Sequence, residues 1–137
     1  TDQVMASLLA LDVGTKRIGV AAADSSVPIA VPLTTVEVDG KEVAAIGKLV
    51  SERSVETIVV GYPRNQSGDP TAQTAVAEAL ADQLQGMAAV VFQDESLTSV
   101  MAEDRLKTAG KPYEKADIDA HAAVIILQDY LETHYAS

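Results

Sequence analysis

The sequence predicts an α/β fold: one five-stranded mixed sheet with helices on both faces. Strand-like apolar segments come first along the chain, and helical and strand-like segments then alternate, which gives the order β-β-β-α-β-α-β-α-α. The 137 residues contain no internal repeat and no linker rich in Pro, Gly or Ser. We therefore expect a single domain over residues 1–137.

Each expected element is marked by its apolar spacing, which has a period of two or a continuous run in strands and a period near 3.6 in helices. In chain order these are strands over 8–13, 17–24 and roughly 31–38, a helix over 41–54, a strand over 56–61, a helix over 71–85, a strand over 87–93, and helices over 98–109 and 118–134.

Turn and capping residues separate these elements. Gly14 opens a break between the first two strands, as in a hairpin, and Asp39-Gly40 ends the third strand. Pro70 is a favoured first residue of a helix, and Gly86 ends the helix that follows it. We expect Asp117 to be the N-cap of the last helix.

The charge balance restricts the possible partners. Ten basic and twenty acidic residues give a net charge of -10, which argues against a protein that simply coats nucleic acid. Either the partner is not a polyanion, or local basic groups and metal ions oppose an acidic surface. The chain has no cysteine, which excludes disulfides and thiol nucleophiles, and its apolar runs are too short to span a membrane. A cytoplasmic protein is expected.

Asp12 is the most unusual residue of the pattern. It interrupts an apolar strand just before the Gly14 turn. A carboxylate that has lost most of its water must be hydrogen-bonded or must bind a cation. Two interpretations stay open: Asp12 accepts backbone N–H groups of the turn, or it holds a metal ion.

Other acids are expected near the same edge of the sheet, where the parallel strands end and where such sheets bind ligands. Asp94 and Glu95 follow a strand, and Asp119 lies near the start of the last helix, where an acid is also favourable for the helix itself. Carboxylates from separate segments suit Mg²⁺ or Mn²⁺. Two such ions about 3.5–4 Å apart can promote phosphodiester hydrolysis. The pattern predicts a divalent-metal site without selecting the reaction.

Four stretches together resemble the YqgF/RuvX family, whose members are described as Holliday junction resolvases and as nucleases that mature the 5′ end of pre-16S ribosomal RNA. In order and spacing they cover nearly the whole chain. They are LALDVGTKRIGVA (9–21), IVVGYPRNQSGDP (58–70), DESLTSVMAEDRL (94–106) and DIDAHAAVIILQDYL (117–131).

The resemblance implies a ribonuclease H-like fold and a hydrolase that cleaves phosphodiesters with Mg²⁺ or Mn²⁺, two ions being expected. It assigns the catalytic, metal-binding acids to Asp12, Glu95 and Asp119, with Asp94 as the alternative to Glu95. Related nucleases carry an acid at the end of the fourth strand. This chain has Gly61-Tyr62-Pro63 there, so the second acid comes from elsewhere.

The resemblance also suggests residues that bind substrate. Lys16 and Arg17, beside Asp12, can grip a phosphate, although a solvated basic turn is the alternative. Asn65 belongs to a loop that resembles the family's N-x-x-G sequence. Two cations of the family are missing, because this chain has Ser96 and Asp117 in their places. Basic residues that can compensate include Arg64 and Lys115.

The favoured function is 5′ processing of pre-16S ribosomal RNA, with the small ribosomal subunit as a possible partner. The alternatives are cleavage of branched DNA in recombination and a non-catalytic nucleic-acid-binding module. A nucleotide-binding phosphotransferase is disfavoured, because such proteins close two domains of this kind over the nucleotide and 137 residues supply one. Monomer and homodimer both stay open.

Overall fold

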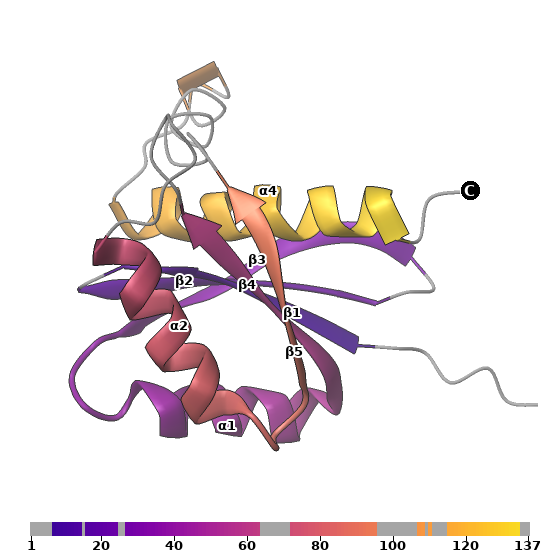
Figure 1. Cartoon of the computed structure of the whole chain (residues 1–137). Helices are drawn as coiled ribbons and strands as arrows, with labels where there is room; N and C mark the ends of the chain where they lie inside the picture. The colour runs from indigo at the N-terminus through magenta and orange to yellow at the C-terminus, as the bar shows by residue number, and fades with distance from the viewer. Residues whose placement is uncertain are drawn as a thin grey trace, which may run out of the picture.

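The computed structural model describes residues 7–14, 16–24, 27–63, 72–95, 107–108, 110 and 115–134 (Figure 1). Within these ranges only the backbone is described at positions 27–28, 63, 72–73, 94–95, 115–117, 119 and 134. The strands are β1 (Ser7–Val13), β2 (Arg17–Asp24), β3 (Val27–Glu37), β4 (Val55–Pro63) and β5 (Ala89–Glu95). The helices are α1 (Glu42–Arg53), α2 (Ala72–Leu84) and α4 (Lys115–His134).

The five strands form one mixed sheet in the order β3-β2-β1-β4-β5. β2 pairs antiparallel with both β1 and β3, whereas β1, β4 and β5 are mutually parallel. The carboxyl ends of β1, β4 and β5 therefore lie at the same edge of the sheet. The first turns of α2 and α4 lie toward this edge, at the left of the view in Figure 1.

The helices cover both faces of the sheet, with α4 on one side and α1 and α2 on the other (Figure 1). Successive strand residues alternate between these faces. In β1, Leu8 and Ala10 pack against α4, whereas Leu9 and Leu11 pack in the core that contains α1 and α2. None of the described helices has the length and apolar character that crossing a bilayer requires.

The expected architecture is confirmed, and the largest differences are at the ends of elements. The third strand begins at Val27 rather than near residue 31, and it includes Pro32. Proline is tolerated there because β3 is at the edge of the sheet, where an N–H group need not bond to a neighbouring strand. The expected strand over 87–93 is shifted to Ala89–Glu95. The Met87 N–H is instead used in the turn after α2, where it donates to the Leu84 carbonyl at 3.1 Å.

The prediction that Asp117 caps the last helix is wrong, because α4 already begins at Lys115 and Asp117 lies inside it. Lysine and alanine, which precede Asp117, are good helix formers and extend the helix by a few residues. Of the helix expected over 98–109, residues 98–106 and 109 lie outside the described residues.

The β1–β2 turn depends on Gly14. Its N–H donates to the Arg17 carbonyl at 2.9 Å, and the Val38 N–H holds the turn from the other side by donating to the Lys16 carbonyl at 3.0 Å. A Cβ atom on Gly14 would lie 2.6 Å from the Arg17 carbonyl oxygen. Only glycine fits this position without a shift of the backbone.

We predict that Gly14→Ala lowers the free energy of unfolding by about 1–3 kcal/mol, because the added methyl group forces the turn apart. Gly47→Ala, inside α1, is the matched control. There the new Cβ would meet only the side chain of Met87, at 3.4 Å. It should be neutral or stabilise by about 0.5–1 kcal/mol. Urea unfolding followed by circular dichroism measures both, and equal stability of the two variants would contradict the prediction.

Candidate active site

Asp12 is held near the carboxyl end of β1, in a strand whose neighbouring residues are buried. It is itself half-buried. Because Leu11 and Val13 pack in the core with α1 and α2, the strand alternation assigns Asp12 to the α4 side of the sheet. The side chain is thus carried by a rigid element toward the face that α4 covers.

The two strands beside Asp12 carry glycine at the adjacent positions. Gly19 of β2 is its direct antiparallel partner. On the other side Leu11 pairs with Val60 of β4, so the next residues along the two strands, Asp12 and Gly61, are neighbours. In the cross-strand row of Asp12, both flanking strands therefore have glycine, which has no side chain.

The backbone hydrogen bonds of the turn bear on the two interpretations of Asp12. The interpretation as a capping residue requires N–H groups from the Gly14-Thr15 segment. The Gly14 N–H donates to the Arg17 carbonyl at 2.9 Å instead, and Thr15 lies outside the described residues. This bond uses the Gly14 N–H, so the capping interpretation of Asp12 loses one of its two donors.

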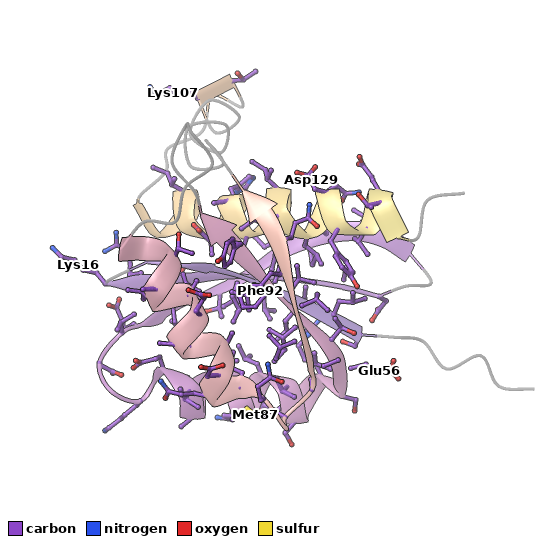
Figure 2. The ribbon with its side chains drawn as sticks, in the orientation of Figure 1. Lys16, Glu56, Met87, Phe92, Lys107 and Asp129 are labelled. Carbon is purple, nitrogen blue, oxygen red and sulfur yellow. The ribbon has the colours of Figure 1, made fainter. Side chains whose placement is uncertain are left out.

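The two predicted basic residues lie beside this carboxylate. Arg17 is half-buried at the start of β2 and alternates with Ile18, which packs in the core with α1 and α2. Arg17 is therefore on the α4 side, diagonal to Asp12 across the hairpin. Arg17 also lies opposite Glu37 of β3 in the sheet register, and such a cross-strand pair of opposite charges is favourable. Lys16 is exposed at the tip of the turn and extends away from the sheet (Figure 2).

For some of the remaining predicted residues the structure describes only the backbone, and the others lie outside the described residues. Glu95 is the last residue of β5 and pairs with Pro63 of β4. Lys115 is the first residue of α4, and Asp119 follows one turn later. Arg64 and Asn65 lie outside the described residues. Among the side chains that the structure describes, no group of three His, Cys, Asp or Glu residues converges, and the side chains of Glu95 and Asp119 are not in that set.

The sheet register also brings Gln93 of β5 into the row of Asp12, a residue that motif reasoning missed. Gln93 pairs with Gly61, the neighbour of Asp12. The side chain is half-buried. The available signal was the strand pattern of residues 89–95, but it becomes informative only when the register between β1, β4 and β5 is known.

The chain is similar in sequence to proteins that are named as nucleases. A relative from Chloroflexus aurantiacus, named "Putative pre-16S rRNA nuclease", is 47% identical over 131 residues, which are 91% of this chain and 86% of that protein. A relative of the same name from Dechloromonas aromatica is 42% identical over 135 residues, covering 94% of this chain and 92% of its own length.

Among solved structures, Thermus thermophilus RuvC is similar in fold. Its structure in complex with a Holliday junction substrate has a TM-score of 0.57 and 14% sequence identity, and covers 93% of this chain and 94% of that chain. A second structure of Thermus thermophilus RuvC has a TM-score of 0.56 and 13% sequence identity, and covers 93% of this chain and 95% of that chain. This similarity confirms the ribonuclease H-like fold.

The sequence profile of the RuvX family, described as Holliday junction resolvase, matches residues 6–133. That match includes the hairpin with Asp12, the parallel strands β4 and β5, and nearly all of α4. The chain therefore belongs to the RuvX family.

Proposed function

We propose that this chain is a divalent-metal-dependent endonuclease that hydrolyses phosphodiesters in structured RNA and processes the 5′ end of pre-16S ribosomal RNA. The observation that carries the proposal is the half-buried Asp12 carboxylate, projected from a rigid strand between two glycines. The family description and the names of the relatives support nuclease activity. The proposed substrate implies action in the cytoplasm on a precursor of the small ribosomal subunit.

The donor set of the site fits a hard divalent cation. Asp12, Glu95 and Asp119 would provide carboxylate oxygens, the ligands that Mg²⁺ and Mn²⁺ prefer. A bound cation supplies positive charge that offsets charge on phosphodiester oxygens and makes water easier to deprotonate. The protein residues fix the position of that charge, because Asp12 is held by a strand of the central sheet.

The strand alternation favours Glu95 over Asp94 as the second acid. On β5, Val91 packs on the α4 side, whereas Val90 packs on the side of α1 and α2. Counting in steps of two, position 95 shares the face of Val91 and Asp12, and position 94 shares the face of Val90. This alternation supports Glu95, rather than Asp94, as the second acid of the proposed site.

The helical periodicity gives similar support for Asp119. Ala123, Ile126 and Leu127 of α4 pack against the sheet in the same core as Leu8 and Ala10 of β1. Position 119 precedes Ala123 by four residues and so belongs to the same stripe of the helix. It lies toward the carboxyl edge of β1, because α4 begins at that edge (Figure 1).

Basic residues at the same edge would bind the phosphates beside the cleaved bond. Arg17 can donate two hydrogen bonds to one phosphate, whereas Lys16 offers a mobile point charge at the tip of the turn. We assign further contacts to Lys115 at the start of α4 and to Arg64 and Asn65. Lys16, Arg17 and Lys115 would oppose the overall net charge of -10 only locally, at the edge where substrate would bind.

We predict that Asp12→Asn reduces Mn²⁺-dependent cleavage of a pre-16S rRNA fragment by at least about 100-fold, because the amide is a weaker metal ligand. The variant should fold, since the change preserves size. The rise in melting temperature that Mn²⁺ causes in the wild type should shrink in the variant. EDTA should abolish wild-type cleavage.

Asp24→Asn is the matched control for this substitution, because Asp24 is exposed at the far end of β2. It should cleave and bind Mn²⁺ as the wild type does. Asp12→Asn protein that cleaves at the wild-type rate would show that the site is wrongly assigned.

A neighbouring pair of variants tests the choice between the acids of β5. Glu95→Gln should lose at least about tenfold in Mn²⁺ affinity, because it removes a ligand, whereas Asp94→Asn should stay within about threefold of the wild type. Isothermal titration with Mn²⁺ measures both. The reverse order of the two affinities would assign Asp94 as the ligand.

Branched DNA is the second candidate substrate, because the family is described as Holliday junction resolvase. The same cleavage assay with a four-way DNA junction separates the two. If the protein cleaves the junction and leaves the RNA fragment uncut, branched DNA is the favoured substrate. Binding of RNA without cleavage, retained after loss of all three acids, would favour a binding module.

A further inference from the structure

Gln93 occupies the same cross-sheet row as Asp12. Gln93 of β5 pairs with Gly61 of β4, and Gly61 in turn neighbours Asp12 of β1. Adjacent strands lie about 4.8 Å apart, so the two residues are separated by about 10 Å of sheet. This row of residues therefore runs from Asp12, the candidate metal ligand, to β5 at the edge of the sheet.

The two side chains also share a face. On β5, Phe92 precedes Gln93 and makes an edge-to-face contact with Tyr62, with ring centroids 5.2 Å apart. The hydroxyl of Tyr62 donates to Glu78 of α2 at 3.4 Å, which fixes this aromatic pair on the α2 side. In the view of Figure 2, Phe92 lies below α4. Gln93, one residue later, is therefore on the α4 side with Asp12.

Gly61 places no side chain between Asp12 and Gln93. A carboxylate and an amide therefore lie on the same face of the sheet, on either side of the buried Gly61, and both are half-buried. Val91, one step earlier on the same face, packs in the apolar core with α4, whereas Gln93 is a polar residue at the carboxyl edge. A polar side chain in this place is suited to contact a substrate held at Asp12.

The chemistry of the amide selects the group that it would contact. A primary amide both donates and accepts hydrogen bonds, as does the ribose 2′-hydroxyl. A phosphate only accepts, and Arg17 and Lys16 on the opposite side of Asp12 already match that requirement.

We propose that Gln93 is a substrate-binding residue that hydrogen-bonds the 2′-hydroxyl of a nucleotide beside the cleaved bond, so that the enzyme prefers RNA to DNA at this position. The proposal rests on the function proposed above. It concerns substrate selection and leaves metal binding to the acids.

The test is a cycle of protein and substrate changes. Gln93→Leu removes the amide, and a pre-16S rRNA fragment with single 2′-deoxynucleotides on each side of the cleaved bond removes the hydroxyl. We expect Gln93→Leu to lower kcat/KM on RNA by about threefold to tenfold, the effect of one lost hydrogen bond. The kcat/KM of the wild type should fall by about the same factor on the deoxy substrate. Gln93→Leu should have the same kcat/KM on the deoxy substrate as on RNA, because the hydrogen bond is already lost.

The controls separate a contact from a structural effect. Gln93→Leu should bind Mn²⁺ as tightly as the wild type, and Gln93→Met, which keeps the length of the side chain, should behave like the leucine variant. Gln83→Leu, on the exposed surface of α2, should cleave both substrates at the wild-type rate.

The proposal is overturned if Gln93→Leu cleaves RNA at the wild-type rate, or if its loss is equally large on the deoxy substrate. Failure of the proposed function looks different, because wild-type protein would then cleave neither RNA substrate in Mn²⁺. That result would overturn both proposals together.

Discussion

The central constraint of the structure is a carboxylate on an otherwise apolar strand. β1 lies in the middle of the sheet, and its other core residues are buried on both faces by helices. Asp12 can occupy that strand only because it is near the carboxyl end, where it is half-buried. The parallel pairing of β1 with β4 and of β4 with β5 then brings the carboxyl ends of three strands to the edge of the sheet at which Asp12 lies.

Most of the fold follows from local pattern. The continuous apolar runs of the strands and the helical spacing of α1 and α2 predict both the order of elements and the layers. The ends of elements depend on contacts that local pattern does not contain. β3 begins at Val27 because that residue pairs with Asp24 across the hairpin. β5 begins late because the Met87 N–H closes the turn after α2.

In the candidate site, too, some residues follow from local sequence pattern and others depend on how the strands pair. Asp12 stands out in the sequence because an acid interrupts an apolar run, and the Gly14 turn after it predicts the hairpin that holds Arg17. The choice between Asp94 and Glu95 could not be made from sequence, because it depends on which face each position takes in the assembled sheet. Gln93 was missed for a related reason: a glutamine in a strand has no distinctive pattern until the register pairs it with Gly61.

The claim that Asp12 is a metal ligand is tested most directly by anomalous diffraction from crystals soaked in Mn²⁺. We expect a peak within coordination distance of the Asp12 carboxylate, about 2.0–2.2 Å from its nearest oxygen, on the side of the sheet that α4 covers. Absence of the peak in isomorphous crystals of Asp12→Asn would complete the assignment. A wild-type map in which Asp12 contacts only protein groups, with manganese bound elsewhere, would contradict it.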